Sequence, residues 1–336
     1  MAAIGRERDK IIDGMPRDEQ GFWQPERGTA PPSPLFAWPP KPVQVFKWLF
    51  GFPGYLFPWN IIYIAIATLT WLYLQPSLSR CTEFRIDWIV EIYLRNQIML
   101  VVITSSWHLR LWSSKSQGLK FKYTSDWMAS GKRQFLCSSQ LVDNIFWSCL
   151  SGAAIWTAYE VLMVWAYANQ IIPYIDPRQR PIYFVILLCG IQMWRLLHFY
   201  WVHRLSHCRP LYKARHYLHH KNINVGPWSG LAMHPIEHIL YFSCILIHWI
   251  VTSHPIHMLM NAQHVAFTPS QGHVGFETLV LKEKVGLPAA SFFPQLHHRY
   301  FECNYGENDM PFDMWFGTYH DGSTEAHMAM RQKGQA

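Results

Sequence analysis

Four apolar stretches divide the chain, and each approaches the roughly 20 residues that a membrane-spanning helix needs. Three of them contain almost no charged residues, although the last of these three is apolar only up to Arg195. The remaining stretch is interrupted by Arg95, Asn96 and His108. Each stretch is predicted to form a transmembrane helix. The four stretches are residues 57–75, 92–109, 144–168 and 182–202.

A further apolar stretch, residues 239–251, is too short to cross a membrane. It is followed by the sequence Thr-Ser-His-Pro at 252–255, which breaks regular structure, before apolar residues resume at 256–267. A short run of this kind is typical of one arm of a re-entrant or interfacial segment. We therefore interpret residues 239–267 as a re-entrant or interfacial hairpin.

Basic residues are distributed unevenly between the apolar stretches. Residues 1–50 contain seven Lys and Arg and residues 110–142 contain six, against two each in residues 76–90 and 169–181. Because cytoplasmic segments are enriched in Lys and Arg, the first two segments are expected in the cytoplasm. With four crossings, the chain after residue 203 is then cytoplasmic too.

These patterns predict an all-α, multi-pass integral membrane protein with about four transmembrane helices, the hairpin and a cytoplasmic helical cap. Residues 1–50 are expected to form a flexible arm whose polar, Pro-rich start is unlike a signal peptide. Residues 51–202 hold the transmembrane helices. Residues 203–336 form the cytoplasmic cap, with the interfacial hairpin over 239–267.

The composition agrees with a membrane location. Charged residues make up only 15% of the chain, below the roughly 25% of soluble domains. The net charge of +7 comes from residues that flank apolar stretches and do not form one stripe, so we interpret them as contacts to membrane lipids and expect no nucleic-acid partner. The seven Cys show no CxxC pairing and are interpreted as buried thiols.

Histidines are concentrated in the second half of the chain, since seventeen of the eighteen follow residue 197. His203 and His207 are four residues apart and therefore share one helical face. His216, His219 and His220 also lie on one face, where two rings can serve one ion and the third ring a neighbouring ion. This spacing indicates metal ligation.

A third cluster consists of the adjacent residues His297 and His298, whose side chains diverge by about 100° on a helix. Such a pair suits two neighbouring ions better than a single ion. Clustered imidazoles with few carboxylates and no thiolates favour Fe, Zn or Cu over Mg or Ca. The sequence therefore predicts a site for two transition-metal ions.

The segments HRLSH, HYLHH and LHHRYFECNYG, followed by PFDMWFGTYHDG, resemble in order and spacing the histidine boxes and C-terminal signature of the fatty-acid hydroxylase/sterol desaturase superfamily. The resemblance covers about residues 180–320. It implies about four transmembrane helices, two iron ions, O2 as co-substrate and an electron-donor protein of the ferredoxin or cytochrome b5 type with its reductase.

The chain departs from the family pattern at Pro294, where the last box carries no histidine. His273, in GHVGFE, resembles an element that some members carry between the boxes. His234 and His238 are spaced i,i+4 and are candidates for either metal ligation or a structural role. The candidate metal ligands are His203, His207, His216, His219, His220, His234, His238, His273, His297 and His298. The candidate catalytic residues are the same set without His234 and His238.

Several other polar residues lie close to the candidate site or within the apolar stretches. His198 and His264 are weaker ligand candidates. Glu160 lies within a predicted membrane span, where a carboxyl group is either functional or hydrogen-bonded between helices. Glu237 and Glu277 lie close in sequence to candidate ligands and could accept the free N–H of a ligating imidazole.

An unactivated C–H bond is too strong for acid–base chemistry, so a hydroxylase or desaturase needs reduced iron and O2. We therefore expect O2-dependent oxidation of a lipid or sterol-like substrate that enters from the bilayer. Two alternatives are a zinc-dependent membrane hydrolase and a non-enzymatic haem- or metal-binding membrane protein. The absence of HExxH disfavours the hydrolase, and histidines outside the apolar stretches disfavour the haem protein.

Overall fold

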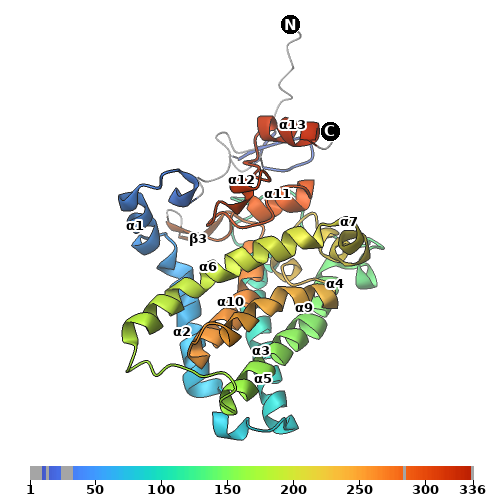
Figure 1. Cartoon of the computed structure of the whole chain (residues 1–336). Helices are drawn as coiled ribbons and strands as arrows, with labels where there is room; N and C mark the ends of the chain where they lie inside the picture. The colour runs from blue at the N-terminus through green and yellow to red at the C-terminus, as the bar shows by residue number, and fades with distance from the viewer. Residues whose placement is uncertain (1–9, 13–14, 24–32, 283–284, 334–336) are drawn as a thin grey trace.

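The computed structural model describes residues 10–12, 15–23, 33–282 and 285–333, and these are mostly helical (Figure 1). The helices are α1 Pro42–Phe50, α2 Ile61–Leu69, α3 Ile86–His108, α4 Gln140–Trp147, α5 Ala153–Ala168, α6 Pro181–Ser206, α7 Arg209–Leu211, α8 Tyr217–His220, α9 Pro235–Phe242, α10 Pro255–Gly272, α11 Phe293–Tyr300, α12 Phe312–Trp315 and α13 Thr324–Lys333. Two antiparallel hairpins are formed by β1 Lys10–Ile12 with β2 Met15–Arg17 and by β3 Thr278–Lys282 with β4 Val285–Pro288.

Three helical segments are long and apolar enough to cross a membrane, namely Leu56–Leu74, Gln140–Ala168 and Pro181–Ser206. The first extends α2 by a π-helical turn at each end, the second joins α4 to α5 through a π-helical turn, and the third coincides with α6. The fourth expected span corresponds to α3, whose 23 residues extend about 34 Å. By length and composition, the described residues therefore supply three candidate spans where four were expected.

The polar residues that weaken α3 have partners inside the bundle. The Arg95 guanidinium forms an ion pair with the buried Glu160 carboxylate of α5. The Asn96 side-chain amide donates to Glu160 at 3.0 Å and to the Thr157 hydroxyl at 3.2 Å. Interhelical hydrogen bonding was one of the two roles considered for Glu160. The contacts to Arg95 and Asn96 show this role, since they join α3 to α5.

The predicted hairpin over 239–267 is present, but its second arm is not at a surface. α9 continues into a 3₁₀ segment, Ser243–Trp249, and α10 begins at Pro255 after the turn. α10 packs against α2, α3, α5 and α6 in the middle of the bundle, and most of its side chains are buried (Figure 1). Burial among neighbouring helices is compatible with the re-entrant alternative, in which protein covers the segment, and the position of the hairpin relative to a membrane stays a prediction.

Part of the expected flexible arm is structured. Arg17 is fully buried, and its guanidinium donates to the Lys122 carbonyl at 2.8 Å. Asp18 forms an ion pair with Arg299 at 2.6 Å. Residues 15–23 thus pack on the cap, whereas residues 1–9, 13–14 and 24–32 of the arm lie outside the described residues.

The cap gathers at one end of the bundle, where α11, α12 and α13 lie close together (Figure 1). α1 precedes the first span and leaves Val43, Phe46 and Phe50 largely exposed, with Lys41 and Lys47 beside them. Exposed aromatic residues next to Lys are typical of a helix that lies at a membrane surface.

Candidate metal centre

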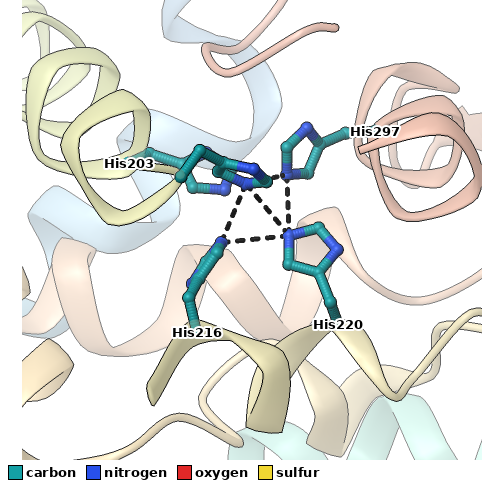
Figure 2. Close-up of side chains that lie close together, drawn as sticks. His203, His216, His220 and His297 are labelled. Atoms are coloured by element: carbon teal, nitrogen blue, oxygen red, sulfur yellow. Dashed lines mark hydrogen bonds between the residues drawn. The ribbon is translucent and has the colours of Figure 1, made fainter. Parts of the chain in front are cut away.

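Eight histidines converge at the cap end of the bundle in two adjacent groups. In each group, the nearest ring nitrogens all lie within 4.8 Å of one another. Figure 2 shows how rings from α6, α8 and α11 meet in the first group. The first group contains His203, His207, His216, His220 and His297, and the second contains His219, His273 and His298.

The local sequence explains how distant residues meet. α6 ends at Ser206, and Pro210 lies at the start of α7, where its missing N–H is tolerated. The chain then reverses through a π-helical turn, Tyr212–His216, into α8. His216 and His220, four residues apart, consequently face the first group, whereas His219 faces the second.

The first group is tightly packed. The Nε2 atom of His207 lies 2.9 Å from that of His216, 3.1 Å from that of His220 and 3.1 Å from that of His297. In the second group, the Nε2 atoms of His273 and His298 are 3.1 Å apart. Two ligands at right angles about one ion, each about 2.1 Å away, are separated by about 3 Å. The spacing therefore fits imidazoles around a shared cation.

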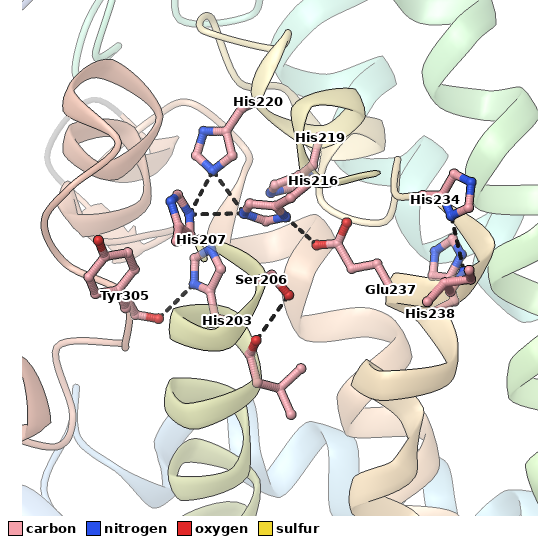
Figure 3. Close-up of polar contacts among 12 residues, drawn as sticks. His203, Ser206, His207, His216, His219, His220, His234, Glu237, His238 and Tyr305 are labelled. Atoms are coloured by element: carbon pink, nitrogen blue, oxygen red, sulfur yellow. Dashed lines mark hydrogen bonds and ion pairs between the residues drawn. The ribbon is translucent and has the colours of Figure 1, made fainter. Parts of the chain in front are cut away.

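In His203 and His216, the second ring nitrogen is held by an oxygen acceptor (Figure 3). The Nδ1 atom of His203 lies 2.7 Å from the Tyr305 carbonyl, and that of His216 lies 2.6 Å from the Glu237 carboxylate. Because carbonyl and carboxylate oxygens accept hydrogen bonds, each Nδ1 carries the proton and each Nε2 keeps a lone pair.

Two further ligand candidates are held in the same way. The Nδ1 atom of His297 lies 2.6 Å from the Cys303 carbonyl, and that of His273 lies 2.9 Å from the Pro269 carbonyl. Their Nε2 atoms therefore also point lone pairs into the groups, where lone pairs about 3 Å apart repel unless a cation lies between them. The donor set fits transition-metal ions, with the outer hydrogen bonds that ligating histidines make.

A short segment near the C-terminus positions two of these rings. The carbonyls of Cys303 and Tyr305 accept from His297 and His203, and Asn304 between them adopts a left-handed conformation with φ 51°. Asp313 fixes this segment, since its carboxylate accepts from the backbone N–H of Tyr305 at 2.8 Å. The sequence signature around Asp313 was recognised, but this supporting role was not.

Burial favours the neutral form of the His219 and His273 imidazoles. Burial, and then the neighbouring His298, hold the pKa of His219 well below its usual range. Burial likewise lowers the pKa of His273 to about 4, although the hydrogen bond to Pro269 opposes the shift. Neutral imidazole is the form that binds a metal ion, so no proton has to be released at neutral pH before binding.

Four predicted or weighed residues lie outside both groups. The ring of His238 contacts the Ser151 hydroxyl at 2.9 Å and the Leu231 carbonyl at 3.0 Å. His234 accepts from the Ile236 N–H at the start of α9. Figure 3 shows both rings set apart from the clustered histidines.

The remaining two of these residues also have other partners. His198 lies 3.0 Å from the Ser243 hydroxyl. Glu277 accepts from the Tyr123 hydroxyl at 2.7 Å and, among the described residues, makes no hydrogen bond to a histidine, unlike Glu237. A fifth residue, His264, was weighed as a ligand and instead contacts Asn60 at 2.9 Å.

A cavity of about 280 Å³ opens directly beside both histidine groups. Its walls combine apolar side chains such as Phe199, Met233 and Tyr241 with ring faces from both groups. Pro294, where the family pattern has a histidine, lines this cavity. His273, which directly follows α10, belongs to the second histidine group. An apolar chamber next to the nitrogens suits a lipid substrate.

Comparison with known proteins identifies relatives over this region. Residues 187–318 match the fatty acid hydroxylase family. A delta(7)-sterol 5(6)-desaturase of Gibberella zeae is 28% identical over 164 residues, which cover 41% of this chain and 44% of that protein. A delta(7)-sterol-C5(6)-desaturase of Nicotiana tabacum is 29% identical over 151 residues, covering 42% of this chain and 49% of that protein.

A third relative is named for a different activity. The very-long-chain aldehyde decarbonylase of Arabidopsis thaliana is 26% identical over 164 residues, which cover 43% of this chain and 26% of that protein. The chain spans about half the length of the sterol desaturases that it matches. No solved structure matches this chain.

Proposed function

We propose that this chain is a membrane-bound di-iron oxygenase of the fatty-acid hydroxylase/sterol desaturase superfamily, because residues 187–318 match the fatty acid hydroxylase family and the chain is similar to sterol desaturases. It hydroxylates or desaturates an unactivated C–H bond of a lipid. One observation carries the proposal: eight imidazoles converge in two adjacent groups on the wall of an apolar cavity.

The two groups divide the proposed ligands between two ions. His203, His207, His216, His220 and His297 would hold one iron, and His219, His273 and His298 would hold the other. Bound iron supplies the one-electron and O2 chemistry that side chains alone lack. His234 and His238, which lie outside both groups, serve as structural residues.

The protein's own groups hold the site in shape. Glu237 and the carbonyls of Cys303, Tyr305 and Pro269 fix the tautomers and orientations of four imidazoles. Aromatic and aliphatic cavity walls, among them Phe199, bind the lipid chain and exclude water from the histidine groups. Exclusion of water matters because it limits uncoupled reduction of O2.

The proposal includes a membrane orientation and a partner. α3 is the fourth crossing, since its Arg95 charge is compensated inside the bundle by Glu160. The basic segments then place the N-terminus, the histidine groups and the cap in the cytoplasm. A soluble or membrane-attached electron donor of the ferredoxin or cytochrome b5 type would reach the site there.

Purified full-length protein in detergent tests the proposal by metal analysis and by mass spectrometry of lipid extracts. We expect two iron ions per chain and an O2-dependent gain of one oxygen or loss of two hydrogens in a lipid. His219→Ala and His297→Ala should each remove metal and turnover, whereas His198→Gln should keep both. Stably bound zinc with O2-independent hydrolysis would instead establish the metallohydrolase alternative.

A further inference from the structure

A polar patch lies in the cavity wall away from the histidine groups. It consists of Gln192 and Arg195 of α6 and His264 of α10, all of which line the cavity and are at least 95% buried. Among the described residues, no hydrogen-bond partner is present for Gln192 Nε2, Arg195 Nε or His264 Nδ1. Buried polar atoms without partners cost free energy, so three of them at one place indicate a missing ligand group.

The patch is separated from the proposed irons along the same helices. Arg195 precedes His203 by eight residues, which corresponds to about 12 Å along α6. Phe199 lies between them, with its ring 5.9 Å from the Arg195 guanidinium carbon and 5.0 Å from the ring of His203. A molecule held at both places therefore has its polar group well removed from the carbon that is oxidised.

The hydrogen-bonding direction of His264 is determined by Asn60. The Asn60 Nδ2 donates to the Tyr55 carbonyl at 2.6 Å, so its Oδ1 is an acceptor. This Oδ1 lies 2.9 Å from His264 Nε2, which must carry the proton. In the neutral ring, His264 Nδ1 is therefore an acceptor without a donor.

The other two free atoms are donors. The Tyr55 hydroxyl donates to the Cys189 carbonyl at 3.1 Å and makes a longer, shared contact to Gln192 Oε1 at 3.4 Å. Among the described residues, the Nε2 amide group of Gln192 has no acceptor. The Nε–H of Arg195 is also free, while its NH2 group binds the Glu307 carboxylate at 2.7 Å. The patch thus offers one acceptor and two kinds of donor.

The charged residues around this patch favour a neutral ligand over an anionic one. The Arg195 charge is already compensated by Glu307, and Asp309 also lines the cavity. A lipid carboxylate would be repelled by both acids and could not donate to His264 Nδ1. A neutral hydroxyl donates one hydrogen bond and accepts others, which matches all three atoms.

Building on the proposed function, we propose that the substrate is a lipid alcohol whose hydroxyl donates to His264 Nδ1 and accepts from Gln192 Nε2 and Arg195 Nε. The patch anchors this hydroxyl, and the apolar part of the molecule runs past Phe199 to the histidine groups. The oxidised carbon then lies far from the hydroxyl. Both a sterol and a long-chain alcohol carry the required group.

Equilibrium binding tests this assignment without turnover. The full-length protein in lipid nanodiscs is titrated with octadecanol, octadecyl methyl ether and octadecanoate, each in competition with tritiated octadecanol. Cholesterol and its methyl ether form a second pair, which distinguishes a sterol from a chain. We expect at least one alcohol to bind about tenfold more tightly than its methyl ether, because the ether cannot donate to His264. Equal binding within both pairs, or tighter binding of octadecanoate, would overturn the assignment.

Variants separate the two halves of the patch. His264→Phe should abolish the preference for alcohol over ether, whereas Gln192→Leu should weaken alcohol and ether alike by about tenfold. Thr268→Val is the matched control, because this cavity-lining hydroxyl already donates to the His264 carbonyl at 2.7 Å. The ligand series on the unmodified protein keeps the test decisive if a variant does not fold.

The result can be read independently of the catalytic proposal. Iron content and O2-dependent lipid oxidation are measured on the same preparations. Protein that contains iron and oxidises lipid but does not discriminate alcohol from ether would overturn the hydroxyl subsite alone. Protein that discriminates them but contains no iron would support the subsite and overturn the proposed oxygenase.

Discussion

The carboxylate of Glu237 on α9 lies 2.6 Å from the Nδ1 atom of His216, a ring that belongs to a different segment of the chain. The contact links the hairpin of α9 and α10 to the first histidine group. It fixes the tautomer of His216 and increases the basicity of the nitrogen that faces the group.

Glu237→Gln should therefore lower iron affinity by about tenfold or more, because a neutral amide oxygen is a weaker acceptor for the imidazole N–H. Iron content after dialysis against a graded chelator measures the effect. Glu277→Gln is the control, since this buried carboxyl contacts Tyr123 and not a histidine. Equal iron retention in both variants would show that Glu237 does not support a ligand.

His273→Ala should remove iron from the second group and abolish lipid oxidation, because His273 is one of only three imidazoles there. His238→Gln should retain full iron content, since the His238 ring contacts Ser151 and Leu231 outside both groups. Metal analysis of the two purified variants checks the pair. Loss of iron from His238→Gln would reinstate His238 as a ligand.

Asp313→Asn should lower the free energy of unfolding by about 2–3 kcal/mol, because hydrogen bonds to a charged acceptor are strong. The Asp313 carboxylate accepts from the backbone of Tyr305 and Gly306 and from Thr318, and an amide group would place an N–H against one of these donors. Thermal unfolding in detergent measures the change. Asp321→Asn, which alters a partly exposed turn, should stay close to wild type.

Glu160→Leu should destabilise the bundle by about 3–5 kcal/mol, because it leaves the Arg95 charge unpaired among apolar helices. Replacing Arg95 by Leu as well removes the unpaired charge, so the double variant should recover most of the loss. Unfolding of Glu160→Leu, Arg95→Leu and the double variant in mixed detergent gives the coupling energy. A double variant less stable than Glu160→Leu would contradict this account.

Asp309→Asn should change how stability depends on pH. Burial, and then the nearby Glu307, raise the pKa of Asp309 from 3.8 to about 6, although Arg195 opposes the shift. The pKa of Asp309 is therefore higher in the folded protein than in the unfolded chain. The stabilisation that protonated Asp309 contributes is fully present below about pH 4 and is lost as pH rises through about 6.

Wild type should therefore lose about 1–2 kcal/mol relative to Asp309→Asn between these pH values, since partial exposure of the carboxyl screens the effect. Thermal unfolding of both proteins across this range measures the difference. Parallel pH profiles would show that Asp309 titrates normally in the folded protein.

The histidine spacing carried most of the information about the candidate site. Helical periodicity placed His216, His219 and His220 on one face, with two rings for one ion and the third for a neighbour. It did not say which ring stands apart, and the structure shows that this ring is His219. The resemblance added His273, which directly follows α10 and is far from the other boxes in sequence. The acceptors Cys303, Tyr305 and Pro269 could not be predicted, since backbone carbonyls leave no residue-type signal.

The helical, membrane-type fold was predicted from apolar runs, and this class is confirmed by the three candidate spans. The burial of α10 was missed, because a run interrupted at residues 252–255 has the length of an interfacial segment and periodicity does not report its neighbours. The partner of Arg95 was missed for a similar reason, since Glu160 lies on a distant helix.

Neighbouring residues of the same helical turn serve different histidine groups: His219 and His220 on α8, and His297 and His298 on α11. A short rigid turn cannot tilt toward one group without moving the adjacent ring in the other. An ion held by the first group would therefore also restrain His219 and His298, which belong to the second group. Under the proposed function, binding of one ion would then favour binding of the other.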